Sequence, residues 1–166
     1  SDLCVLGLPY ENAERRLDAE AWLFGAGRPC LMLPADYNGG FTLDRVAIAW
    51  DASKSAARAV GDALPMLKRA KSVTVLLARG EKVIAGEAPA QSLIDYLAAH
   101  GIVATVDDFE IGGRSIGRAL LDRGRDHKAD VLVMGAFGHS RLREFILGGA
   151  TKEVLDTSIR PVLMSH

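Results

Sequence analysis

The sequence predicts an α/β fold in which helices cover both faces of a parallel β-sheet. From Leu43 onward, short apolar runs typical of buried strands alternate with longer amphipathic segments typical of helices. The strand segments are continuously apolar and do not alternate with polar residues, as expected for strands buried on both faces. A chain that alternates strand and helix in this way forms parallel strands joined by right-handed crossovers.

The elements can be assigned in order along this part of the chain. The strand segments are short and apolar: Arg45–Trp50, Ser72–Ala78, Val103–Asp107, Val131–Met134 and Pro161–Met164. The helical segments have apolar residues at helical spacing: Ser53–Arg69, the segment between Pro89 and Gly101, Ser115–His127 and Gly149–Asp156. Ser53 is expected to cap the first helix, Pro89 to open the second and Gly101 to end it.

Composition and charge exclude several classes of partner. The chain has 166 residues, of which 49% are hydrophobic and 25% charged, and its formal net charge is −1. Because no basic or acidic run is present, neither nucleic acid nor a membrane is an expected partner, and no apolar run approaches the roughly 20 residues that span a bilayer. The N-terminal residues lack the form of a secretory signal, so we expect a cytoplasmic protein with Cys4 and Cys30 as buried, reduced thiols.

The N-terminal residues resemble the last part of the chain. Asp2–Gly7 repeats the form of Asp130–Gly135, and Arg28–Met32 repeats Arg160–Met164. Between the first two segments, Ala19–Phe24 stands where a helix is expected in the later copy. Such self-similarity is the sequence signature of a repeat architecture.

The repeat predicts how the chain is divided. Residues 1–34 are expected to be the last strand–helix–strand of a preceding copy, residues 35–42 a linker, and residues 43–166 a complete copy. The chain would then be the C-terminal part of a longer tandem protein. The last strands of the two copies are expected to pair, with Cys30–Leu33 beside Val162–Met164, because two exposed edge strands would otherwise invite aggregation.

A glycine-rich stretch separates the strand Val131–Met134 from the helix that follows it. Its glycines are Gly135, Gly138, Gly148 and Gly149. A strand that leads through glycines into a helix is typical of phosphate binding, because glycines let the backbone approach an anion and the N–H groups of the first helical turn point at it. The spacing matches neither the dinucleotide fingerprint nor the Walker loop.

Residues 43–166 resemble a universal stress protein domain over their full length. The resemblance rests on Trp50–Ser53 after the first strand, Ala129–Asp130 before the fourth, the glycine-rich stretch and the closing Arg160–Leu163. It implies a doubly wound, five-stranded parallel sheet of the adenine nucleotide alpha hydrolase-like kind, with strand order 3-2-1-4-5. Ligands of such sheets bind at the carboxyl ends of the strands, at the point where the order reverses.

The resemblance also implies a set of nucleotide contacts. Asp51 would hold the ribose, because a carboxylate accepts hydrogen bonds from ribose hydroxyls. Ala78, at the end of the second strand, would meet the adenine through its backbone. Gly135, Gly138 and Gly148 would line the phosphates.

Other residues near the predicted phosphate site are less regular. The family pattern continues with Ser or Thr where this chain has Gly149, which keeps a backbone N–H but offers no hydroxyl. Thr151 could supply a hydroxyl from the first helical turn, and His139 and Arg141 place basic groups beside the predicted anion. Each has an alternative explanation without a ligand: Thr151 as a residue of the helix start, and the basic residues as ordinary surface charge. Asp51 could likewise begin a turn before the first helix.

Two functions therefore remain open for a protein of this kind. The first is a stress-response module that binds ATP or a related adenine nucleotide, with or without Mg, and forms a dimer through its last strand. The second is a nucleotide-free dimerisation or protein-interaction module of the same family, which the Gly149 departure favours. Catalysis is limited at most to slow ATP hydrolysis, because the sequence has no Walker lysine and no nucleophile–His–Asp set. No metal-ligand spacing is present either.

Overall fold

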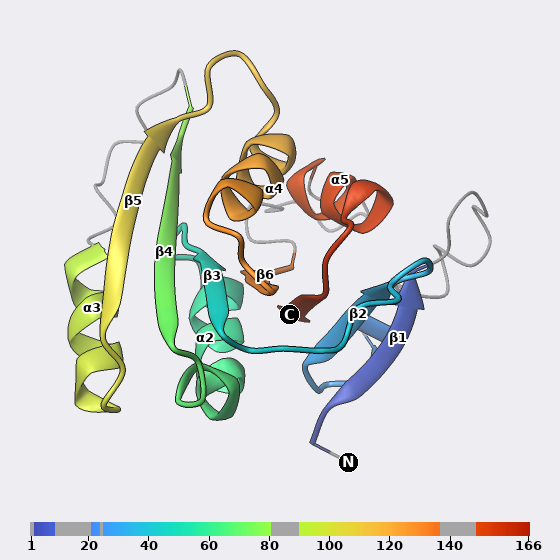
Figure 1. Cartoon of the computed structure of the whole chain (residues 1–166), viewed down its shortest axis with the longest axis horizontal. Coiled ribbons are helices and arrows are strands. Elements are labelled where there is room, and N and C mark those ends of the chain that lie inside the picture. The colour runs from blue at the N-terminus through green and yellow to red at the C-terminus, as the bar shows by residue number, and fades with distance from the viewer. Residues whose placement is uncertain (1, 9–20, 24, 81–89, 137–148) are drawn as a thin grey trace.

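The computed structural model describes residues 2–8, 21–23, 25–80, 90–136 and 149–166. They form one seven-stranded sheet with the order β1-β2-β7-β6-β3-β4-β5 (Figure 1). The strands are β1 Cys4–Leu8, β2 Cys30–Pro34, β3 Arg45–Ala49, β4 Ser72–Arg79, β5 Ala104–Glu110, β6 Val131–Gly135 and β7 Val162–Ser165. The helices are α2 Lys54–Leu67, α3 Ala90–Ala99, α4 Ile116–Asp126 and α5 Gly149–Thr157. None of the described helices is long and apolar enough to cross a membrane.

The α/β fold with a mainly parallel sheet is confirmed. The strands β5, β4, β3, β6 and β7 all run parallel to one another. Numbered from β3 along the chain, they lie in the order 3-2-1-4-5. The order reverses between β3 and β6, which pair from Val46↔Val131 to Ile48↔Val133. Residues that follow these two strands therefore meet at one edge of the sheet.

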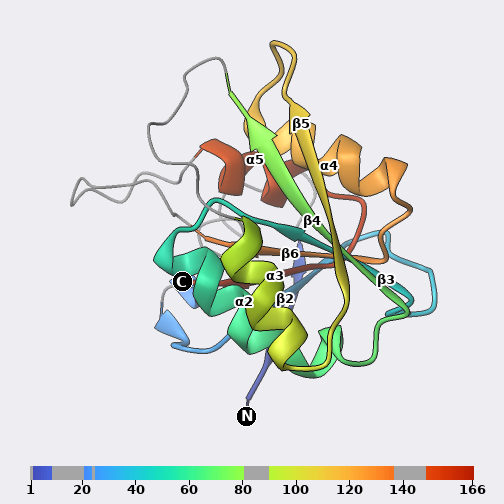
Figure 2. The same ribbon diagram turned by 90° about the vertical axis from the view of Figure 1, so that its left-hand side faces the viewer.

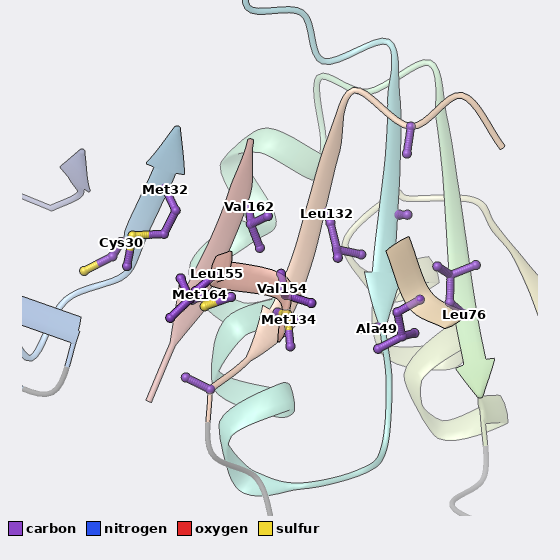
Figure 3. Packing of buried hydrophobic residues seen from close by; sticks show 14 of the residues in the cluster. Cys30, Met32, Ala49, Leu76, Leu132, Met134, Val154, Leu155, Val162 and Met164 are labelled. Atoms are coloured by element: carbon purple, nitrogen blue, oxygen red, sulfur yellow. The ribbon is translucent and has the colours of Figure 1, made fainter. Parts of the chain in front are cut away.

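Helices cover both faces of the sheet (Figures 1 and 2). On one face α2 lies mainly over β6 and β7 and α3 lies beside β5, and residues such as Ala59, Ala63 and Leu97 share one core with side chains of β3, β4, β6 and β7. On the other face α4 packs against β4 and against α5, and Figure 3 shows Val154 and Leu155 of α5 among the side chains of that core, near Met134, Val162 and Met164. Burial of these apolar side chains provides the main driving force for this layered arrangement.

Two helices, α2 and α4, begin with a serine whose hydroxyl caps the first turn. Ser53 Oγ accepts a hydrogen bond from the N–H of Ala56, and Ser115 Oγ accepts one from Arg118. The third strand of the domain differs from the prediction: β5 begins one residue later than expected and continues to Glu110. It extends because β4 pairs with it as far as Arg79↔Glu110 and Phe109 is buried, whereas Val103 is 89% exposed. The predicted start of the second helix, Pro89, lies outside the described residues.

The N-terminal strands join the sheet as the repeat predicts. β1 runs parallel to β2, residues 21–23 between them are helical, and β2 pairs antiparallel with β7. The predicted neighbours Cys30–Leu33 and Val162–Met164 thus lie side by side, with Leu31 opposite Leu163. Both edges of β7 are occupied within the chain, by β6 and β2. No free edge remains there for the dimer through the last strand that the sequence analysis expected.

Cys4 and Cys30 are direct partners across the β1–β2 ladder. Cys30 is buried as predicted, but Cys4 is only half-buried, because β1 is the outermost strand. Both thiols are free. Burial raises the pKa of the Cys30 thiol from 9.0 to about 11, and the adjacent Cys4 thiol adds to this effect.

This pKa predicts a loss of stability in alkali. Below pH 9 the thiol is protonated in both the folded and the unfolded state, so the raised pKa has no effect. Between pH 9 and about 11 the unfolded chain releases the proton and the folded chain does not, so the free energy of unfolding falls, by about 2–3 kcal/mol at most. Urea unfolding measured from pH 8 to 11 should show this fall.

The same titration with Cys30→Val should lack that part of the fall, because the variant has no thiol at position 30. Valine is chosen because it is the residue at the equivalent position 162. Cys4→Leu is the matched control, and it should retain most of the fall because burial is the larger cause. An identical pH dependence in wild type and Cys30→Val would contradict the assignment.

Candidate functional site

The carboxyl ends of β3 and β6 meet at the first turn of α2. Asp51 follows β3, Gly135 ends β6, and α2 begins at Lys54 with Ser53 as its cap. The order of the sheet reverses between these two strands. A crevice at such a reversal is the usual ligand site of an open α/β sheet.

Asp51 organises the turn between β3 and α2. Its Oδ1 accepts a hydrogen bond of 2.9 Å from the N–H of Ser53, and Ala52 between them has a φ of 55°. A positive φ is costly for a residue with a Cβ, and the Asp51–Ser53 hydrogen bond that spans Ala52 offsets part of this cost. The alternative explanation of Asp51, as the residue that begins the turn, is therefore observed. The side chain is also exposed at the edge of the sheet.

Two serine hydroxyls lie beside this turn. Ser53 Oγ and Ser55 Oγ are 3.1 Å apart, and both side chains are half-buried. The sequence analysis named Ser53 only as a helix cap and missed Ser55. The sequence contained one indication of this proximity. Asp51, Ser53 and Ser55 are alternate residues in the turn that leads into α2, and residues spaced in this way can lie close together.

Gly135 is required by the packing of α2. A Cβ at this position would lie 2.3 Å from the backbone N of Ala56 and 2.7 Å from Ser55 Oγ. These distances are far below van der Waals contact and involve backbone, so no side chain fits. Close packing on the helix therefore accounts for this glycine, and it also brings the N–H groups of the first turn of α2 to the end of β6.

The remaining predicted contacts are distributed as follows. Ala78 is half-buried near the end of β4, opposite Phe109 of β5. Gly149 is the first residue of α5, is exposed, and has open space where a Cβ would stand. Thr151 is only 3% exposed, so its hydroxyl faces the interior of the protein. The predicted contacts Gly138, His139, Arg141 and Gly148 lie outside the described residues.

The start of α5 is held against the start of α4. Glu153 of α5 accepts hydrogen bonds from the hydroxyl of Ser115 and, at 3.1 Å, from the N–H of Arg118. A Cβ on Gly117 would lie 2.9 Å from the carbonyl oxygen of Ala150, so a glycine is needed for this approach. A carboxylate at a helix N-terminus is favourable for both the cap and the helix dipole. The contacts of Ala150 and Glu153 with α4 therefore fix the position of Gly149 at the start of α5.

Two further features border the site. Next to Ala78, Arg79 forms a bidentate ion pair with Asp108, and the hydrogen bonds from Arg79 hold the pKa of this carboxyl below its usual range. The indole nitrogen of Trp50, directly before Asp51, is buried and has no hydrogen-bond partner among the described residues. No group of three His, Cys, Asp or Glu side chains in the described part of the chain is arranged to hold a metal ion.

Comparison with known proteins identifies relatives of the domain. The model of the Universal stress protein family matches residues 42–166. No curated protein sequence matches the chain.

Solved structures share the fold. A universal stress protein from Archaeoglobus fulgidus DSM 4304 has a TM-score of 0.67 and 23% identity, over 84% of this chain and 51% of its own. A putative universal stress protein from Pseudomonas aeruginosa UCBPP-PA14 has a TM-score of 0.63 and 17% identity, over 99% of this chain and 63% of its own. A universal stress protein in complex with cAMP has a TM-score of 0.55 and 21% identity, over 74% of this chain and 97% of its own. The chain thus spans between half and two thirds of the length of the first two.

The packing of α2 on β6 predicts the effect of a single methyl group. Gly135→Ala should lower the free energy of unfolding by about 1–3 kcal/mol, because the helix or the strand must shift to admit the Cβ. Gly149→Ala is the matched control and should be neutral or slightly stabilising, since a Cβ meets open space in a helix. Urea unfolding of both variants checks the prediction, and equal effects would show that Gly135 is not confined by α2.

Proposed function

Because the chain belongs to the universal stress protein family, we propose that it binds ATP or a related adenine nucleotide where β3 and β6 end. The observation that carries the proposal is the meeting of three groups at the reversal of the sheet order. These are the exposed carboxylate of Asp51, the backbone beside Gly135, and the N-terminal turn of α2. A relative of the same fold in complex with cAMP supports it.

In this proposal each group has a defined task. Asp51 accepts hydrogen bonds from the ribose hydroxyls through the oxygen atoms of its carboxylate. Gly135, Gly138, Gly148 and Gly149 offer backbone N–H groups to the phosphates.

The surroundings of these groups complete the proposed site. The backbone of Ala78 meets the adenine, and His139 and Arg141 add positive charge near the phosphates. Mg could accompany the phosphates, held chiefly by their own oxygens. Thr151 would contact the phosphates only in a conformation in which its buried hydroxyl turns outward. The protein would act as a cytoplasmic stress-response module whose occupancy carries the signal.

Nucleotide release is the first test. Freshly purified protein is treated with acid, the supernatant is analysed for nucleotides, and ATP and AMP are titrated calorimetrically. We expect stoichiometric adenine nucleotide or saturable binding. Asp51→Ala should weaken binding about 10- to 100-fold, as for a lost hydrogen bond to a charged group. The control, Asp126→Ala at the far end of α4, should leave affinity unchanged. Circular dichroism confirms that both variants are folded.

The departure at Gly149 gives a gain-of-affinity prediction. Gly149→Ser restores the hydroxyl of the family pattern at a position with room for it. A neutral hydrogen bond is worth about 0.5–1.5 kcal/mol net, so ATP affinity should rise by up to about tenfold. Calorimetry compares this variant with Gly149→Ala, which adds a Cβ and no hydroxyl and should leave affinity within about twofold of wild type.

The second candidate is an interaction module without nucleotide. It is favoured by the structural tasks that Asp51 and Gly135 already have in the turn and in helix packing, and by the missing hydroxyl at Gly149. Absence of nucleotide after purification, together with no heat at millimolar ATP and AMP, would reject the first candidate and leave this one.

A further inference from the structure

The two cysteines of the chain face each other across neighbouring strands. Cys4 of β1 and Cys30 of β2 are direct partners in the parallel ladder. Their side chains lie on the same face of the sheet, because both pack in the same core cluster. The two thiols are hydrogen-bonded to each other, and the Cys30 thiol also donates to the carbonyl oxygen of Arg28 at 3.7 Å. The sulfur atoms are therefore already in contact in the folded protein.

A disulfide can span two cysteines placed in this way. Neighbouring strands lie about 4.7–4.9 Å apart, and the Cα atoms of a disulfide are usually about 4.4–6.8 Å apart. Because the side chains of parallel partners point in the same direction, their Cβ atoms are also about one strand spacing apart, which exceeds the roughly 3.5–4.5 Å of a relaxed disulfide. A bond formed here is strained, and strained disulfides are easily reduced.

Packing in this register does not require sulfur. In the similar segments Asp130–Gly135 and Arg160–Met164, the positions of the two cysteines are occupied by Leu132 and Val162, which are direct partners in the β6–β7 ladder. Both side chains are buried. An aliphatic pair therefore fills the same place in a ladder of the same sheet, so the paired thiols need an explanation beyond packing.

The two thiols differ in their access to solvent. Cys4 is half-buried on the outermost strand of the described sheet, whereas Cys30 is fully buried on β2, between β1 and β7 (Figure 1). Burial also raises the pKa of Cys30, so its thiol is protonated at neutral pH, and protonated, buried thiols react poorly. A dissolved oxidant therefore reaches Cys4 first, and Cys30 is the neighbouring thiol that completes the reaction.

We propose that Cys4 and Cys30 form a redox modification site, at which a hydroperoxide generates a reversible disulfide between β1 and β2. The Cys4 thiolate attacks the peroxide and breaks its O–O bond, which gives a sulfenic acid on Cys4 and releases water or an alcohol that carries the thiol proton. The sulfur of Cys30 then attacks the sulfur of Cys4. The S–S bond forms, and the sulfenic oxygen leaves as water with the Cys30 proton. Two electrons pass from the two sulfur atoms to the peroxide, and two equivalents of a small thiol reverse the change by exchange.

The bond acts on a part of the sheet away from the proposed nucleotide site. It joins residues 4 and 30 and so fastens β1 to β2, which is paired on its other side with β7. The strands β3 and β6, where Asp51 and Gly135 lie, come after β7 in the order of the sheet. The proposal is therefore independent of whether the protein binds a nucleotide.

Mass spectrometry after treatment with hydrogen peroxide tests the proposal. The reduced protein is treated in the presence of a metal chelator, its remaining thiols are alkylated under denaturing conditions, and intact and peptide masses are measured. We expect the loss of two hydrogen atoms, no alkylation, and a linked peptide that contains Cys4 and Cys30. Methionine oxidation is distinguished because it adds an oxygen atom. Two alkylated cysteines after treatment would overturn the proposal, as would a disulfide-linked dimer as the main product.

Single substitutions test the order of the two steps. In Cys30→Val the sulfenic acid on Cys4 has no thiol to react with, so dimedone should label it, whereas the wild type should carry little label. In the matched variant Cys4→Leu, Cys30 should react with peroxide at least about 100-fold more slowly than free cysteine, because a pKa of about 11 lowers its thiolate fraction by that factor. Rapid oxidation of Cys30 in this variant would contradict the assigned order. Circular dichroism checks that both variants are folded, and the wild-type masses remain decisive if either is not.

Reduction of the oxidised protein tests reversibility. The disulfide form is incubated with reduced glutathione without denaturant, and free thiols are counted by alkylation over time. Because the bond is strained by the strand spacing and one of its sulfur atoms is half-exposed, we expect both thiols to return. A disulfide that persists in reduced glutathione would show a structural bond and would overturn the assignment of a reversible site.

Discussion

The contact between Gly135 and the first turn of α2 is the constraint on which the candidate site depends. It brings the end of β6 under the helix that follows β3, so that two strands from distant parts of the sequence end at one point. The same contact places the first turn of α2 at the end of β6, directly after the turn that carries Asp51. Both the packing of β6 against α2 and the proposed ligand site therefore require that residue 135 is a glycine.

The β2–β7 ladder has an equivalent importance for the other half of the sheet. It converts an edge strand into an interior one and places Leu31 directly opposite Leu163. Arg58 of α2 reinforces this junction by donating to the carbonyl of Gly27, and Asp62 accepts from the hydroxyl of Ser165 at the end of β7. The helix α2 thus forms hydrogen bonds with residues on both sides of the β2–β7 ladder.

Much of this fold could be predicted from the sequence, because buried parallel strands and amphipathic helices have distinct periodicities. The repeat also predicted that Cys30–Leu33 lies beside β7. The extension of β5 to Glu110 could not be predicted, since Asp107 and Asp108 interrupt its apolar pattern and only the ladder with β4 shows the strand continuing. For the site, the sequence marked Asp51 and Gly135, but local spacing alone could not show that Gly135 packs against α2 or that Thr151 is buried.

The long separation in sequence between the partners of the β2–β7 ladder has a consequence for folding kinetics. Leu31 and Leu163 are far apart in sequence, so the ladder closes a very large loop, whereas β3–β4 and β4–β5 join neighbouring segments. Contacts of high sequence separation form slowly, because the loop entropy is lost before the contact is gained. The N-terminal strands should therefore dock last. Until they dock, the apolar edge of β7 is open to pairing with other chains, and the speed of this final step limits how much of the newly made protein escapes aggregation.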